Sequence, residues 1–202
     1  MKLRYMMCHI VCTSALLTAC QTDLPSFDSY NPFKSANDTT AKSTKPVLNT
    51  LPSTERKSPI DDKIFAEILT LDKNEIAAAR EGEKKATQPK IREFAKYLVK
   101  HHSMNLNKTL TLSHKLKITP EDDYRSMQMQ RDGERELTQL KTLDESDFDS
   151  VFLNDMIRDH RQALSLLNDA LRKVTNPMLK AHLMAMYQVV EHHLEQAQAL
   201  KA

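Results

Sequence analysis

Four ionisable side chains occupy positions where the inner faces of a helical bundle are expected. These residues are Glu75, His102, His160 and His193. Each interrupts a series of apolar residues spaced three and four apart, which is the spacing of the buried face of a helix. One carboxylate and three neutral imidazoles are ligand types that suit zinc, copper, iron or nickel. The pattern therefore predicts a transition-metal site in the core, with these four residues as its ligands.

Three of the apolar series are regular, and the one around His102 is softer because Asn105 and Thr109 also stand in it. The residues around Glu75, His102, His160 and His193 are, in turn, Ile64, Ile68, Leu71, Ala78 and Gly82; Ile91, Ala95, Leu98, Leu112 and Leu116; Leu153, Ile157, Leu164, Leu167 and Leu171; and Leu179, Leu183, Met186, Val190 and Ala197. In the second series either of the adjacent histidines could point inward. We expect the remaining histidines of these segments to face solvent, namely His101, His114, His182 and His192. Met156, one turn before His160, is the one methionine that could join the site.

The heights of the four residues along the bundle follow from their distances to the predicted turns. Antiparallel helices joined by a short loop place residues that are equidistant from the loop at the same height. Glu75 and His102 each lie about 20 Å from a turn near residue 88, and His160 and His193 each lie about 25 Å from a turn near Asn176. We therefore expect two facing pairs. Whether they share one layer depends on how the segment between the second and fourth helices carries the chain.

A second interpretation of the same four residues needs no ligand. A buried glutamate beside a histidine satisfies both groups through hydrogen bonds and helps to fix the register of the helices. The protein would then be a structural or interaction protein whose outer surfaces meet a partner in the cell envelope. The first interpretation is a non-enzymatic binding module for a metal ion or a small ligand. Both remain open at this point.

Enzymatic functions receive less support from the sequence. A di-iron site of the ferritin type needs Glu-x-x-His on two helices. The residues three before His102, His160 and His193 are Val99, Ile157 and Val190. Nucleophilic catalysis lacks a glycine-rich elbow and an identifiable Ser/His/Asp arrangement. A metal-dependent oxidoreductase or hydrolase is therefore our third hypothesis, and we expect no catalytic residues.

The elements that must position the four side chains are helices. Glycine is confined to Gly82 and Gly133, and β-branched and aromatic residues are sparse, so strands and tight hairpins are poorly supplied. Proline and cap residues, including Ser146 as an N-cap, mark the boundaries. The predicted helices cover residues 61–86, 89–117, 121–142, 147–174 and 177–200. We predict an all-α domain over 61–202. The mixed charges, which sum to +2, form no basic stripe and argue against nucleic acid as a partner.

The N-terminal segment predicts secretion and a lipid anchor. Lys2 and Arg4 precede an apolar stretch that ends in Leu-Thr-Ala-Cys at Cys20. This order resembles the signal and lipobox of bacterial lipoproteins, in which the cysteine is acylated, and Gln21 resembles the pattern sorted to the outer membrane. We expect a signal peptide over 1–19 and a disordered tether over 20–60, where five of the eight prolines lie. The domain would then sit on an envelope membrane, facing the periplasm or the cell surface.

Several short motifs resemble a bacterial family known as domain of unknown function 4142. They are Asn74-Glu75-Ile76, Phe94-Ala95, Val99-Lys100-His101-His102, Phe148-Asp149 with His160, and His193-Leu194. The resemblance covers nearly all of residues 60–200. It implies a ferritin-like four-helix bundle with one additional connecting helix, labelled in this family as an outer-membrane protein. It also implies that Glu75, His102, His160 and His193 are the positions that the family's pattern selects.

Overall fold

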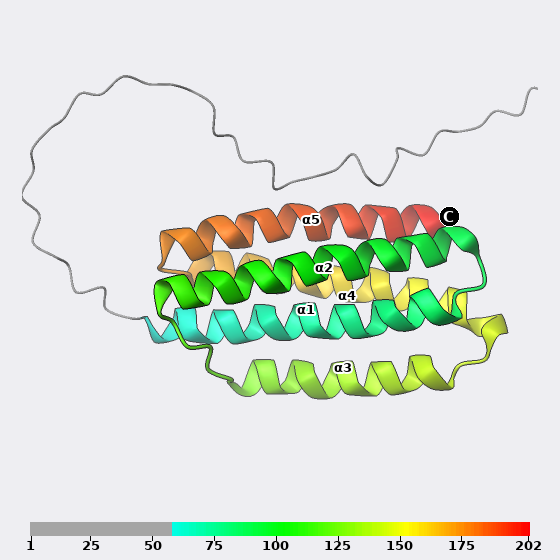
Figure 1. The fold of residues 1–202 in the computed structure, drawn as a ribbon, viewed down its shortest axis with the longest axis horizontal. Helices are drawn as coiled ribbons and strands as arrows, with labels where there is room; N and C mark the ends of the chain where they lie inside the picture. Colours follow the sequence, from blue (N-terminus) through cyan, green and yellow to red (C-terminus); the bar gives the residue numbers. More distant parts are fainter. Residues whose placement is uncertain (1–57) are drawn as a thin grey trace, which may run out of the picture. The chain divides into compact units, whose positions relative to one another are not determined.

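The computed structural model describes residues 58–202 as five helices and no strand. The predicted signal peptide, Cys20 and nearly all of the predicted tether lie outside the described residues. The helices are α1 (Pro59–Lys85), α2 (Pro89–Leu116), α3 (Tyr124–Thr142), α4 (Glu145–Lys173) and α5 (Pro177–Lys201), shown in Figure 1. The expected all-α bundle of four long helices and one connecting helix is confirmed. No helix between Pro59 and Lys201 is both long and apolar enough to cross a bilayer.

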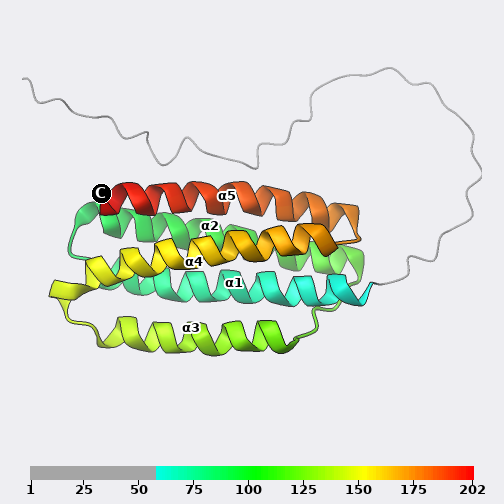
Figure 2. The same cartoon turned by 180° about the vertical axis from the view of Figure 1, so that it is seen from behind.

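Two antiparallel helical hairpins form the bundle. α1 and α2 make the first hairpin and α4 and α5 the second, and they meet through contacts of α1 with α4 and of α2 with α5. Both ribbon views place α3 outside this arrangement, alongside α1 (Figures 1 and 2). α3 carries the chain from the end of α2 back along the bundle to the start of α4. Because α3 returns the chain in this way, α4 and α5 pack against α1 and α2 around one shared core.

The two hairpins hold each other's loops in the same way. Asp61, in the first turn of α1, accepts hydrogen bonds from the backbone N–H of Thr175 (3.0 Å) and of Asn176 (3.1 Å) in the α4/α5 loop. Asp149, near the start of α4, accepts bonds from the backbone N–H groups of Thr87 and Gln88, both at 2.9 Å, in the α1/α2 loop. Each threonine hydroxyl also donates to the same carboxylate. The buried carboxylates thus satisfy loop donors that would otherwise lack partners.

This correspondence extends into the core. The spacing from Asp61 to Asp149 equals the spacing from Thr87 to Thr175, and it also separates Asp72 from His160. This two-fold correspondence relates the first hairpin to the second at these positions.

The α3 helix is fastened to α1 by specific contacts. The Asn74 side chain donates to the carbonyl of Met129 at 2.8 Å, and Gly133 lies so close to Asn74 that a Cβ atom there would overlap it. Lys85 donates to three carbonyls at the end of α3, those of Leu140, Lys141 and Leu143. A cation at this position also interacts favourably with the helix dipole.

Some predicted boundaries are wrong by a few residues. α1 begins at Pro59 and not at 61, and α3 begins at Tyr124 and not at 121. A capping box fixes the latter start, because Asp123 accepts from the Ser126 N–H while Ser126 Oγ accepts from the Asp123 N–H. Ser146 is not the N-cap of α4. That position belongs to Asp144, and Ser146 is an exposed residue of the first turn.

Candidate metal centre

Three of the four predicted site residues form one buried cluster. His160 and His193 are fully buried and His102 is 3% exposed. Each offers one ligand atom such that the three atoms lie within 4.8 Å of one another. A point between three such atoms lies at most roughly 2.8 Å from each, against metal–nitrogen distances of roughly 2.0–2.1 Å for zinc. A contraction of less than an ångström at each ligand would thus close the site around an ion.

The cluster joins both hairpins in a single layer. The imidazole of His102 on α2 lies with its centroid 5.8 Å from that of His160 on α4 and 5.1 Å from that of His193 on α5. The centroids of His160 and His193 are 5.4 Å apart, so the predicted contact of this pair is confirmed. The sequence left the relative level of the two pairs open, and the structure places them together.

His102 is oriented by a carboxylate that the sequence reasoning missed. Its Nδ1 lies 3.0 Å from Oδ1 of Asp72, a fully buried residue of α1, whose Oδ2 accepts from Asn105 at 2.6 Å. Burial works to lower the pKa of His102, but the bond to Asp72 and the nearby Glu75 carboxylate outweigh it and raise that pKa. A histidine whose Nδ1–H is held by a carboxylate presents a more basic Nε2, as in many metal sites. Distance from the α1/α2 turn could have revealed Asp72, because it is at nearly the same height as Asn105.

His160 is held by its own helix. Its Nδ1–H donates to the carbonyl oxygen of Met156 at 2.8 Å. Burial lowers the pKa of His160 to about 3, so the ring is neutral at physiological pH. The bond fixes the tautomer with its lone pair on Nε2. The sequence offered Met156 as a possible further ligand. In the structure its backbone carbonyl orients the His160 ring.

His193 is in contact with a histidine that was expected to face water. Nδ1 of His101 lies 3.2 Å from Nε2 of His193, and His101 is only 8% exposed because its ring packs against Tyr97. The expectation of a solvent-facing His101 is therefore wrong. Both neighbouring histidines of α2 reach the core, because the α2/α5 contact covers the flank on which His101 lies. Burial lowers the pKa of His101 to about 4 and lowers that of His193 as well.

Glu75 lies beside the three histidines. Its Oε1 is 3.8 Å from Nδ1 of His160, and the residue is 4% exposed. The expected proximity of Glu75 to His102 agrees with its charge helping to raise the pKa of His102, although Asp72 takes the hydrogen-bonding position on that ring. Burial raises the pKa of Glu75 to about 8.

One atom of each predicted site residue is buried without a hydrogen-bond partner among residues 58–202. These atoms are Oε2 of Glu75, Nε2 of His102, Nε2 of His160 and Nδ1 of His193. Buried polar atoms of native proteins are nearly always paired with protein groups, water or ions. On the three histidines the opposite ring nitrogen is already engaged, and wherever that nitrogen carries the ring proton the unpaired nitrogen can supply a lone pair. The arrangement fits the coordination of one transition-metal ion by three imidazoles, with Glu75 nearby.

The other histidines lie apart from this cluster. His114 is exposed, as expected, and His192 is half-buried. His182 is partly buried and its Nε2 lies 2.8 Å from the hydroxyl of Thr109, so the expectation that it faces solvent is wrong. Thr109 lies about 10 Å beyond His102 along α2, so His182 does not reach the three-histidine layer.

The comparisons with known proteins agree with the motifs that the sequence carries. No curated protein and no solved structure matches this chain. A family model does match, over residues 48–200, which include all five helices except the last residue of α5. Its description is "Domain of unknown function (DUF4142)", and the chain belongs to this family.

Proposed function

We propose that the helical domain binds one transition-metal ion through His102, His160 and His193. The observation that carries this proposal is the set of buried ring nitrogens without protein partners, one on each histidine. The nitrogens at the other side of these rings are held by Asp72, by the Met156 carbonyl and by His101. Such outer contacts orient ligand rings and set their tautomers in metal sites.

A purely structural polar layer accounts less well for this arrangement. Polar groups that serve only to fix helix register are expected to form hydrogen bonds with one another, because a buried polar atom without a partner destabilises the fold by about 1–3 kcal/mol. Here the outer nitrogens are paired and the inner ones are not, and the three histidines also offer one ring nitrogen each within 4.8 Å of one another.

The donor set favours particular metals. Three neutral imidazoles suit zinc, copper, nickel or cobalt, whereas magnesium and calcium prefer oxygen ligands. Two buried carboxylates, Asp72 and Glu75, lie around the histidines, and burial raises the pKa of both. A divalent cation would balance these two charges in the core and would displace protons on binding. Glu75 or a water molecule would complete a tetrahedral site.

Metal uptake by the purified protein tests this proposal. Inductively coupled plasma analysis and calorimetric titration with Zn²⁺ should give one ion per chain, and Co²⁺ should give the absorption bands of a tetrahedral nitrogen-rich site. His160→Ala and His193→Ala should abolish the site, while His114→Ala, which removes an exposed histidine, should leave it intact. An absence of uptake by the unaltered chain would remove the proposal.

We further propose that this binding takes place at a bacterial envelope membrane. The support is the predicted signal peptide with Cys20 at its end, followed by the predicted tether. Two or more acyl chains at this cysteine would give durable anchoring. Cys20→Ser should release the protein from the membrane fraction. Retention of the Cys20→Ser protein at the membrane would contradict a lipid anchor.

A further inference from the structure

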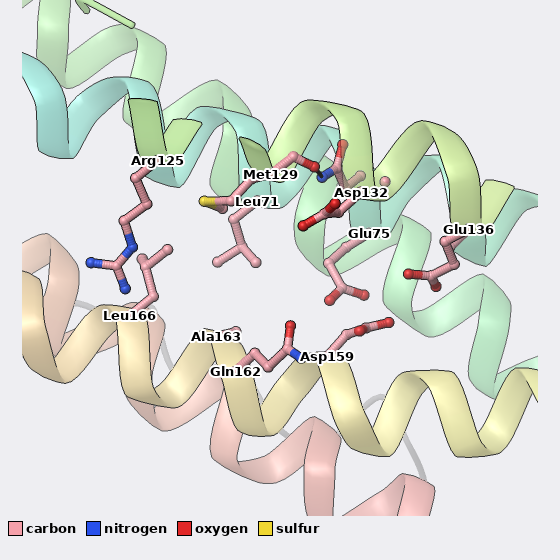
Figure 3. A pocket seen from close by; sticks show the side chains of 13 residues that line it. Leu71, Glu75, Arg125, Met129, Asp132, Glu136, Asp159, Gln162, Ala163 and Leu166 are labelled. Carbon is pink, nitrogen blue, oxygen red and sulfur yellow. Dashed lines mark hydrogen bonds between the residues drawn. The ribbon is translucent and has the colours of Figure 1, made fainter. Parts of the chain in front are cut away.

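A pocket opens beside the histidines, between α1, α3 and α4. Its volume is about 210 Å³, and apolar residues such as Leu71, Ala163 and Leu166 line one part of it. The other part is acidic. Figure 3 shows the carboxylates of Glu75, Glu136 and Asp159, one from each helix, turned toward the same space.

Glu75 belongs both to this pocket and to the surroundings of the histidines. It lines the pocket, and its Oε1 lies 3.8 Å from Nδ1 of His160. It is 4% exposed, and its Oε2 is buried without a hydrogen-bond partner among the described residues. The two other carboxylates are nearer to water, since the side chains of Glu136 and Asp159 are 18% and 19% exposed. Carboxylates thus extend from the pocket's outer part to the edge of the histidine cluster.

The acidic part of the pocket holds more carboxyl groups than cations. Arg158 is the cation that reaches it, through contacts of 3.2 Å with Glu136 and 2.9 Å with Asp159. The same guanidinium also pairs with Asp155. Arg125 lines the far part of the pocket, where it pairs with Glu67 and Asp169. Burial, and after it the neighbouring Asp159, raises the pKa of Glu136 to about 8, so this carboxyl group gives up its proton readily only near that pH or to an incoming cation.

We propose that this pocket is the route by which a divalent cation reaches the histidines. Glu136 and Asp159 attract the hydrated ion, and Glu75 passes it to the cluster. The inference rests on the proposed metal-binding function and adds how the buried site is loaded. Clefts lined by charge of one sign raise the rate of association of an oppositely charged ligand by about ten- to a thousandfold.

The geometry favours a route over a second tight site. Within residues 58–202, the only group of three or more potential ligands whose atoms lie within 4.8 Å of one another is the histidine cluster. Glu75, Glu136 and Asp159 are therefore not close enough to one another for all three to bind a bare ion at once. They can hold an ion that keeps part of its water shell, which is a suitable intermediate between solvent and a dry nitrogen site.

The kinetics of metal binding test this inference. Co²⁺ is mixed with the metal-free full-length protein in a stopped-flow instrument, and the absorption of the bound ion is followed. The double variant Glu136→Gln/Asp159→Asn should bind Co²⁺ about tenfold more slowly or slower still. Its dissociation should slow in parallel, so that the dissociation constant is unchanged. The matched control is Glu93→Gln/Glu191→Gln, which removes the same charge from exposed positions on α2 and α5 and should bind at the unaltered rate.

A variant that adds negative charge to the pocket should bind Co²⁺ faster than the unaltered chain. Faster binding cannot be explained by a loss of stability. Gln162 lines the same pocket, so Gln162→Glu should accelerate association, and added salt should diminish the acceleration. If the unaltered chain binds Co²⁺ but all of these variants bind at its rate, the pocket is not the route and the metal site stands. If the double variant instead weakens equilibrium binding at an unchanged association rate, the pocket is part of the site and the route is also overturned.

Discussion

Asp72 holds the outer nitrogen of His102 at 3.0 Å, and the inner nitrogen of the same ring has no hydrogen-bond partner in the described part of the chain. The pair is fully enclosed, with Asn105 satisfying the second oxygen of the carboxylate. This relationship distinguishes a ring prepared to donate its lone pair from one that merely fills the core. The first prediction follows directly from it.

Asp72→Asn should weaken metal binding without changing its stoichiometry. The amide keeps the size of the side chain but removes the negative charge that makes the inner nitrogen of His102 more basic. Loss of such an outer partner lowers metal affinity by about 10- to 100-fold. Competition titration with a chelator of known affinity measures the change. Unaltered affinity in this variant would show that Asp72 serves the fold alone.

Metal should stabilise the native protein. An ion that binds the folded but not the unfolded chain adds about 2.7 kcal/mol to the free energy of unfolding at a free concentration of 100 times the dissociation constant. Thermal unfolding with excess Zn²⁺ should therefore give a higher Tm than unfolding in a chelator. His193→Ala should abolish the difference. A Tm that does not respond to Zn²⁺ in the unaltered protein would count against the site.

The metal-free protein should lose stability as the pH rises from about 6.5 to 8. Burial raises the pKa of both Glu75 and Glu136 to about 8, so the native state holds protons that the unfolded chain has already released. The unfolding free energy then falls with rising pH, by on the order of 1 kcal/mol or more over this window. His160, whose pKa is lowered to about 3, is neutral in the native state but partly protonated in the unfolded chain near pH 6.5, so it opposes the change at the lower end of the window and hardly at all near pH 8.

Urea unfolding in a chelator, at several pH values in this window, measures that dependence. Glu136→Gln removes one of the two raised carboxyl groups and should flatten the curve. Stability that increases with pH in the unaltered protein would show that both carboxyl groups are already ionised at pH 6.5 and that their pKa values are not raised.

Asp149→Ala should destabilise the fold and leave metal stoichiometry unchanged. The substitution removes the acceptor for the backbone N–H groups of Thr87 and Gln88 and for the Thr87 hydroxyl. We expect a loss of about 2–4 kcal/mol, since several buried donors lose their partner together. Asp61→Ala should produce a loss of similar size, because Asp61 plays the same role for the other loop. Very different losses in the two variants would contradict the two-fold correspondence.

Gly82→Ala should destabilise the contact between α1, α2 and α4. A Cβ atom at Gly82 would lie 2.6 Å from a ring carbon of Phe152 and 2.8 Å from Cβ of Ala95. Overpacking of this kind costs about 1–3 kcal/mol. Denaturant unfolding measures the loss, and Gly82→Ser should lose at least as much. Stability equal to that of the unaltered chain would mean that the ring of Phe152 moves aside freely.

Much of this structure could be predicted from the sequence, because the helices are long and their apolar series continue on both sides of a single ionisable residue. The turns at Pro89 and Pro177 fixed the heights of the core residues, and the contact of His160 with His193 followed from those heights. The shared layer could not be predicted, since it depends on the path of α3 outside the bundle. His101 was misplaced because a helical pattern alone does not show how wide a face α5 covers. Asp72 was missed because it lies beside the apolar series of α1, next to Leu71, and does not interrupt it.

X-ray absorption spectroscopy of the zinc-loaded protein identifies the atoms that bind the ion. The three-histidine site predicts imidazole scattering from three nitrogen ligands at roughly 2.0–2.1 Å, with a fourth light atom from Glu75 or water. A first shell made only of oxygen atoms, or a spectrum unchanged in the His160→Ala protein, would contradict it.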